Sequence, residues 1–203
     1  MDSSHPMIIT ISGNPGSGKS TIAKLVVQKL RYERVYAGGI MRDTAKEQGL
    51  TLEQFMSYLS TNPKVEQEID YKVRDIAYAL ERTQKNILVE GRVQYHLIPN
   101  SIKIYIKVDA KEGAHRILKD LQDTQTSQQR NQQTASTIEE VIKLNEQREE
   151  TDAQRYQKLY GIDHRIETQY DLVIDTTNIT AQQAANKLIT YIENREKKQQ
   201  KAL

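Results

Sequence analysis

Apolar positions along the chain follow two periods in turn, and this alternation predicts repeated strand–helix units. Short β-branched runs predict buried strands, whereas apolar residues spaced three and four apart predict amphipathic helices. The predicted strands are 7–12, 34–37, 86–90, 102–108 and 170–175. The predicted helices are 18–30, 38–47, one that starts at Thr51, 63–83, 110–121, 137–160 and 180–194. Strands that alternate with helices favour the α/β class, with a five-stranded parallel sheet and helices on both faces.

Two local signals and two polar segments refine this pattern. Thr51 with Gln54 three residues on is typical of a helix N-terminus, and Pro63 fits the first position of the next helix. Residues 122–137 are rich in Gln, Thr and Ser, and their position alone fits a disordered insertion as well as a mobile lid. The residues that flank the segment favour the lid. The tail 195–203 is expected to be frayed helix.

Composition restricts the class of protein. A chain of 203 residues suits one domain, 1–203, and zero cysteines exclude disulfides and thiolate metal sites. The net charge of +2 gives no support for a protein dedicated to nucleic acid or a membrane surface. With no apolar run of membrane length and no visible signal peptide, we expect a cytoplasmic protein. We also expect a monomer.

The strongest chemical signal is a phosphate-binding loop. Residues 13–20 read Gly-Asn-Pro-Gly-Ser-Gly-Lys-Ser, directly between a predicted strand and a predicted helix. Backbone N–H groups at such a helix N-terminus attract phosphate, and Lys19 can reach the β- and γ-phosphates. The Ser20 hydroxyl is the usual contact to the Mg²⁺ that accompanies a nucleotide. The residues expected to bind ATP are Gly13, Asn14, Pro15, Gly16, Ser17, Gly18, Lys19, Ser20 and Thr21.

A second set of charged residues indicates a second phosphorylated substrate. Arg92 ends a buried strand, where open parallel sheets bind ligands. Arg148, Asp152 and Arg155 are spaced to share one helix face. Arginine can bind a phosphate through two parallel hydrogen bonds. A protein that only binds ATP as a switch has no need for such a second phosphate site. The chain lacks an Asn-Lys-x-Asp guanine-reading motif, which weighs against a GTPase.

Several stretches together resemble the cytidylate kinase family, and its shorter archaeal-type branch most closely. They are 9–21, Ala-Gly-Gly-Ile-Met-Arg at 37–42, Val-Glu-Gly-Arg at 89–92, residues 148–163 and residues 170–176. The segment 148–163 reads Arg-Glu-Glu-Thr-Asp-Ala-Gln-Arg-Tyr-Gln-Lys-Leu-Tyr-Gly-Ile-Asp and is more family-specific than the phosphate-binding loop. The resemblance implies a P-loop kinase that transfers the γ-phosphoryl group of ATP to CMP or dCMP with Mg²⁺. It also implies an NMP-binding segment at about 38–83 and a lid region at about 114–147.

The resemblance further implies roles for individual residues. Lys19, Arg92 and Arg116 would be catalytic, with Arg116 neutralising the transferring phosphoryl group; Arg130 is a second lid candidate. The residues that would bind CMP are Arg42, Arg92, Arg148, Asp152 and Arg155. Ser20 and Glu90 would bind the Mg²⁺ ion, directly or through water. For Glu90 a purely structural pairing with Arg or Lys remains an equal alternative.

Cytosine recognition is where the sequence departs from the family. Val93 stands where bacterial members carry an Asp that reads the base, and Tyr71-Lys72-Val73 stands in place of an Arg-Arg-Gln-like stretch. Candidates for reading the base are Asp70, Lys72 and Arg74. The alternatives left open are another acceptor (AMP, UMP or shikimate), a non-catalytic ATP-binding assembly factor of adenylate-kinase-like fold, and a disabled paralogue.

Overall fold

The chain folds around a five-stranded parallel sheet with strand order β2-β3-β1-β4-β5. The structure is a computed structural model, and it describes residues 6–122 and 135–201. The strands are β1 (Ile8–Gly13), β2 (Glu33–Tyr36), β3 (Ile87–Glu90), β4 (Ile102–Lys107) and β5 (Leu172–Asp175). All four neighbouring pairs are parallel. The predicted sheet is therefore confirmed.

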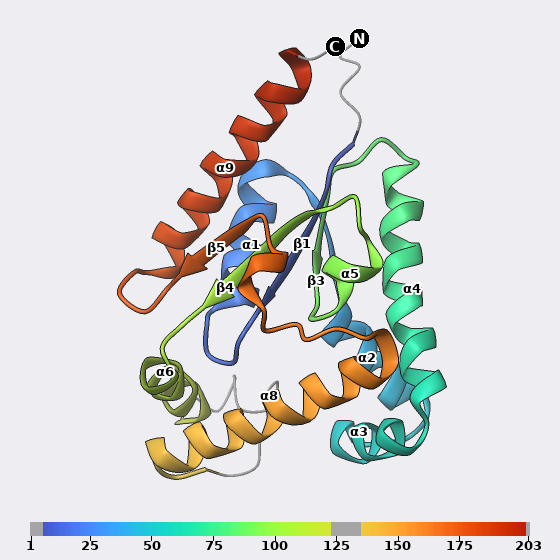
Figure 1. Cartoon of the computed structure of the whole chain (residues 1–203), viewed down its shortest axis with the longest axis vertical. Helices are drawn as coiled ribbons and strands as arrows, with labels where there is room; N and C mark the ends of the chain where they lie inside the picture. Colours follow the sequence, from blue (N-terminus) through green and yellow to red (C-terminus); the bar gives the residue numbers. More distant parts are fainter. Residues whose placement is uncertain (1–5, 123–134, 202–203) are drawn as a thin grey trace.

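Helices cover both faces of the sheet, as Figure 1 shows. In the first half of the chain they are α1 (Lys19–Leu30), α2 (Ala37–Glu47), α3 (Leu52–Thr61), α4 (Pro63–Glu81) and α5 (Gln94–Leu97). In the second half they are α6 (Ala110–Gln122), α8 (Ile138–Tyr160), the 3₁₀ turn η1 (Glu167–Gln169) and α9 (Ala181–Lys201). The short α5 and η1 were not predicted, because each is too brief to show a helical period.

The side-chain alternation of β1 divides the core between two layers. Ile9 and Ile11 pack with α1 and α9 on one face, and Ile8 packs on the other with Val73 and Ala77 of α4. Successive strand residues point to opposite faces, so a run in which every residue is buried needs helices on both sides. A separate cluster around Phe55 joins α2, α3 and α4 beside the sheet.

Helix ends follow the predicted signals where these exist. Thr51 and Gln54 form a reciprocal capping box at the start of α3, and Pro63 opens α4. A second capping box, Thr137 with Glu140, starts α8. The last helix continues to Lys201, through most of the stretch expected to fray.

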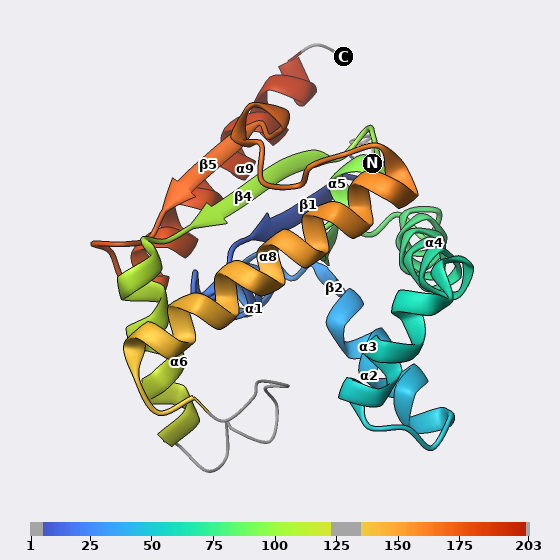
Figure 2. The same ribbon diagram turned by 60° about the horizontal axis from the view of Figure 1, so that its bottom comes forward.

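The helix α8 crosses the carboxyl edge of the sheet. Figure 2 shows it between α6 on one side and the α2–α4 group on the other. The phosphate-binding loop and the end of β3 lie at this same edge, where parallel sheets bind ligands. The Gln-rich lid candidate falls mostly on 123–134, outside the described residues, and Arg130 falls there too.

Candidate active site

The phosphate-binding loop joins β1 to α1 and depends on glycine. Gly16 and Gly18 both have φ of 78°, in the left-handed region that side chains disfavour. At Gly16 there is also no room, because an added Cβ would lie 2.4 Å from the carbonyl oxygen of Gly113 in α6. The loop therefore needs glycine at this position for both its shape and its close contact with α6.

Two hydrogen-bond systems fix this loop to the neighbouring strands. The Asn14 side-chain amide donates to Val108 O at 2.9 Å and its Oδ1 accepts from Val108 N at 3.1 Å. Thr176 Oγ1, just after β5, donates to Ser17 O at 3.1 Å. Asn14, expected among the ATP-binding residues, thus uses its side chain to hold the loop. The loop is built before any nucleotide arrives, which favours anion binding by its N–H groups.

Glu90 forms the centre of a buried ionic cluster beside the loop. Its carboxylate is fully buried and lies 3.0 Å from Lys19 Nζ, and it also accepts hydrogen bonds from Ser20 Oγ and from Arg34 of β2. Burial opposes ionisation of Glu90, but Lys19, Ser20 and Arg34 outweigh it and hold its pKa below the ordinary value. The structural pairing with Lys and Arg is therefore present, and no contact with Arg92 is found within 6–122 and 135–201.

The donor set around Glu90 suits Mg²⁺. A carboxylate and a serine hydroxyl are hard oxygen ligands, and Mg²⁺ is usually bound by one or two such groups with nucleotide phosphates and water. In the described part of the chain no group of three or more His, Asp or Glu could hold a metal alone. Ser20 and Glu90 would thus hold Mg²⁺ together with the nucleotide.

A second charged cluster centres on Asp152 of α8. The Asp152 carboxylate is almost fully buried, accepts from Arg155 at 2.6 Å and lies 3.3 Å from Arg92 Nε. Burial would raise the pKa of Asp152, but Arg92, Arg155 and Arg148 hold it below its usual range. The mutual repulsion of neighbouring guanidiniums, with burial, lowers the pKa of Arg148 in turn. Four of the five predicted acceptor-site residues are therefore brought together.

Two carboxylates of α4 extend this cluster. Arg155 Nε donates to Glu66 Oε1 at 2.8 Å, and Tyr160 OH donates to Asp70 Oδ2 at 2.8 Å. Burial raises the pKa of Asp70 to about 7, since the hydrogen bond from Tyr160 offsets only part of the desolvation. Burial also raises the pKa of Glu66. Glu66 was not predicted, although two acids four residues apart on the apolar side of an amphipathic helix are a usable signal.

Several buried polar atoms in this cluster have no hydrogen-bond partner among the described residues. Buried groups of this kind are nearly always satisfied, so each indicates a missing ligand or water. The atoms with neither a hydrogen bond nor an ion-pair contact are Glu66 Oε2, Gln94 Oε1 and His164 Nδ1. Arg92 Nε, Asp152 Oδ2, Glu149 Oε1 and His164 Nε2 also lack a hydrogen bond, but they take part in ion pairs at 3.3–3.8 Å within the cluster. A polar small molecule that offers both donors and acceptors is the kind of ligand that would complete these contacts.

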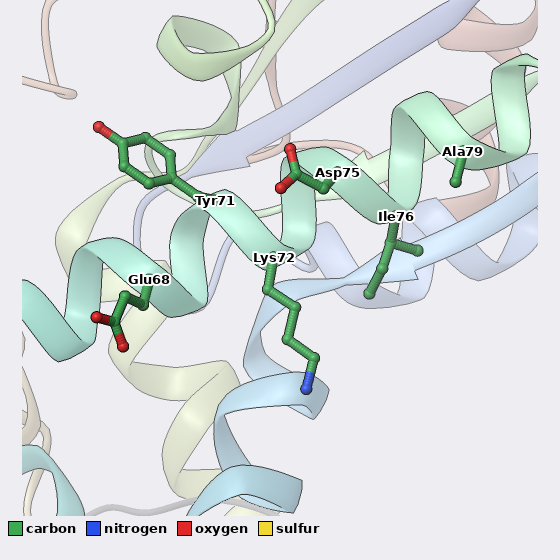
Figure 3. Close-up of a pocket in the computed structure, with 6 residues that line it drawn as sticks. All are labelled: Glu68, Tyr71, Lys72, Asp75, Ile76 and Ala79. Carbon is green, nitrogen blue, oxygen red and sulfur yellow. The ribbon is translucent and has the colours of Figure 1, made fainter.

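The other predicted base-reading residues do not face this cluster. Lys72 lines a groove along the outer side of α4, together with Glu68, Tyr71 and Asp75 (Figure 3). Arg74 pairs with Asp75 at 2.8 Å and stacks on the Tyr71 ring. Of the three base-reading candidates, only Asp70 therefore lies beside the arginines.

Two predicted arginines lie apart from the Asp152 cluster. Arg116 donates to Glu112 at 2.8 Å and to Thr176 O at 2.7 Å, and Thr176 in turn donates to Ser17 O of the phosphate-binding loop. Arg42 of α2 lies over the ring of Tyr36, with its guanidinium carbon 5.1 Å from the ring centroid. Arg34 and Tyr36 were not predicted, because their role depends on β2 lying next to β3.

A phosphate-binding loop that faces a second group of guanidiniums across the edge of a parallel sheet is the arrangement of a P-loop kinase. The chain belongs to the cytidylate kinase-like family, whose model matches residues 8–178.

Similar proteins of known identity support this family assignment. The chain is 32% identical to the cytidylate kinase of Archaeoglobus fulgidus over 188 residues, which cover 92% of this chain and 95% of the relative. It is 34% identical to that of Methanocaldococcus jannaschii over 196 residues, 94% of this chain and all of the relative. A solved shikimate kinase from Acinetobacter baumannii shares the fold, with a TM-score of 0.57 at 15% identity over 95% of this chain and 96% of the other. In the described part of the chain, no helix is both long and apolar enough to span a bilayer.

Proposed function

We propose that this protein is a nucleoside monophosphate kinase that transfers the γ-phosphoryl group of ATP to CMP or dCMP, giving ADP and CDP or dCDP. The observation that carries the proposal is the buried Asp152 cluster, in which three arginines and several unpartnered polar atoms lie at the same sheet edge as the phosphate-binding loop. A donor site alone has no need for such a cluster. Membership of the family supports the same acceptor.

The proposed reaction is an in-line displacement. An oxygen of the CMP phosphate attacks the γ-phosphorus, the bond from that phosphorus to the β–γ bridging oxygen breaks, and ADP leaves. The acceptor phosphate is already an anion above its second pKa near 6, so no strong base is required. Catalysis then consists of alignment and charge neutralisation.

The residues divide into donor and acceptor groups. Residues 13–21 hold the ATP phosphates, with Lys19 as the mobile cation. Arg42, Arg92 and Arg155 hold the CMP phosphate, whereas Arg148 and Asp152 lie along the ribose. Arg116, which is linked to the loop through Thr176, neutralises charge on the transferring group.

Mg²⁺ held by Ser20, Glu90 and the nucleotide would neutralise phosphate charge in this site. The NMP-binding segment corresponds to α2, α3 and α4, which share their own apolar cluster beside the sheet. That separate cluster supports treating them as one unit within a single kinase domain.

A coupled ADP-release assay tests the proposal. The protein is given ATP and Mg²⁺ with CMP, dCMP, UMP, AMP or shikimate in turn, and the products are identified chromatographically. We expect rapid ADP release with CMP and dCMP and formation of the matching diphosphate. Release with only UMP, AMP or shikimate would assign a different acceptor. ATP binding without transfer to any acceptor would instead support an assembly factor or a disabled enzyme.

A further inference from the structure

The ring of Tyr36 contacts two guanidiniums from different parts of the site. Its centroid lies 4.6 Å from the guanidinium carbon of Arg34 and 5.1 Å from that of Arg42, both within cation–π distance. Tyr36 is the last residue of β2 and pairs in register with Glu90 at the end of β3. One aromatic side chain therefore lies between the Glu90 cluster and the start of α2.

The two arginines differ in what else they bind. Arg34 forms an ion pair with Glu90, so its position is fixed by a buried charge. Arg42 makes no ion pair with any carboxylate of residues 6–122 or 135–201. A long side chain with no anionic partner has many rotamers to lose when it binds a phosphate. The Tyr36 ring is the contact that restrains it.

Two glycines make room for the ring. An added Cβ on Gly38 would lie 2.9 Å from Cε2 of Tyr36, and one on Gly39 would lie 3.1 Å from Cδ1. Neither glycine has a positive φ, so the backbone conformation does not require glycine at either position. Glycine is unfavourable inside a helix by about 1 kcal/mol relative to Ala, yet two occur in the first turn of α2. The Tyr36 ring is the group that an added Cβ at either position would meet first.

We propose that Tyr36 is a positioning residue that holds Arg42 ready for the acceptor phosphate, and that Gly38 and Gly39 provide the space its ring needs. This inference rests on the proposed function, because it assigns Arg42 to that phosphate. Tyr36 itself touches no reacting atom. Its effect is to restrict Arg42 before the ligand binds, which lowers the entropy lost on binding.

The test compares CMP affinity among variants of the full chain. Calorimetry gives the Kd for CMP, and steady-state kinetics give kcat and the KM values for CMP and ATP. A lost cation–π contact corresponds to a change of about two- to fivefold in affinity. We therefore expect Tyr36→Leu to weaken CMP binding about two- to fivefold, with an unchanged KM for ATP. Tyr36→Phe keeps the ring and should restore wild-type CMP affinity.

Gly38→Ala adds a specific control. The new Cβ should displace the ring and weaken CMP binding as much as Tyr36→Leu does, but it should add nothing to Tyr36→Leu in the double variant. Tyr71→Leu is a second control on the outer side of α4. It removes a similar ring, whose centroid lies 4.6 Å from the guanidinium carbon of Arg74, and should leave CMP binding unchanged.

The outcomes separate this inference from the proposed function. If Arg42→Ala weakens CMP binding but Tyr36→Leu does not, the positioning role is refuted and the kinase assignment stands. An equal loss of ATP and CMP affinity in Tyr36→Leu would also refute the positioning role. The same holds if Gly38→Ala weakens CMP binding as much in the Tyr36→Leu background as it does in the wild type. Failure of the wild-type protein to bind any nucleoside monophosphate would refute the proposed function itself.

Discussion

Lys19 Nζ lies 3.0 Å from Glu90 Oε1, so the cation of the phosphate-binding loop is paired with a fully buried carboxylate. The Lys19 ammonium has three N–H donors, so a nucleotide phosphate that binds it would compete with Glu90 for this cation. Glu90 then keeps Arg34, its second cation, and is not left as an uncompensated buried charge. This gives a physical role to Arg34, a second basic residue that lies on β2 outside the phosphate-binding motif.

Lys19→Ala should reduce turnover by about two orders of magnitude or more, because it removes a cation that stabilises charge in the transition state. ADP release with CMP measures this effect, and circular dichroism checks the fold. Lys24→Ala removes the same charge from an exposed position on the same helix and should have little effect. Near-normal turnover in Lys19→Ala would contradict the assigned donor site.

Arg155→Ala should weaken use of CMP more than use of ATP. Loss of a charge-assisted contact to phosphate is worth about 1.5–3 kcal/mol, which corresponds to a rise of about 10- to 150-fold in the KM for CMP. The change also leaves Glu66 without its partner, so a loss of stability is expected as well.

Arg155→Ala with Glu66→Gln separates these two effects. Removing the stranded carboxylate charge should restore part of the lost stability without restoring the use of CMP. Arg165→Ala is the matched control, because Arg165 is more exposed and pairs with Asp163 and Glu150 instead. A selective rise in the KM for ATP would show that Arg155 is assigned to the wrong substrate.

Asp70 should make stability depend on pH. Its pKa is raised to about 7 in the folded protein, whereas an unfolded Asp titrates near 4. The folded protein therefore binds this proton more tightly than the unfolded chain does, and the contribution of Asp70 to stability falls as pH rises from about 4 to about 7.

Asp70→Asn should remove this dependence. The quantity to compare is the melting temperature of Asp70→Asn minus that of the wild type. We expect this difference to be at least about 2 °C larger at pH 8 than at pH 5, since 1 kcal/mol shifts the melting temperature by about this much in a domain of this size. Asp75→Asn, with a side chain 62% exposed on the same helix, is the control. An identical difference at both pH values would contradict the raised pKa.

Arg116→Ala should lower kcat more than it raises the KM for CMP. Its guanidinium contacts Thr176, which holds Ser17 of the loop. A group that neutralises charge mainly in the transition state acts on kcat, so a loss of about 10²-fold is expected. Glu112→Gln weakens one partner of Arg116, 2.8 Å away, while keeping the arginine and the hydrogen bond from Thr176 to Ser17, so its effect should be smaller. If both substitutions changed only the KM for ATP, Arg116 would be a nucleotide-binding residue without a catalytic role.

The sequence predicted those features that depend on local order or regular spacing. The loop at 13–20 and the shared face of Arg148, Asp152 and Arg155 both follow from neighbours along the chain. What it missed depends on the order of strands. Arg34 meets Glu90 only because β2 pairs with β3, and nothing in the sequence near Arg34 specifies that neighbour.

Contacts between helices that are far apart in the sequence could not be predicted either. The contact of Glu66 with Arg155 joins residues 89 positions apart, on α4 and α8. The periodicity of each helix gives its buried side but not the helix that covers it. The apolar side of α4 was visible, whereas the partner of its two acids was not.

The direction of α9 has a practical consequence for attaching other molecules. The helix leaves the carboxyl end of β5 and runs back along the sheet against α1, so the last turns of α9 lie at the end of the molecule where β1 begins (Figure 1). Both substrates are proposed to bind at the opposite edge. A fluorophore, a surface tether or a second enzyme joined beyond either end of the domain would therefore leave the approach of both nucleotides open.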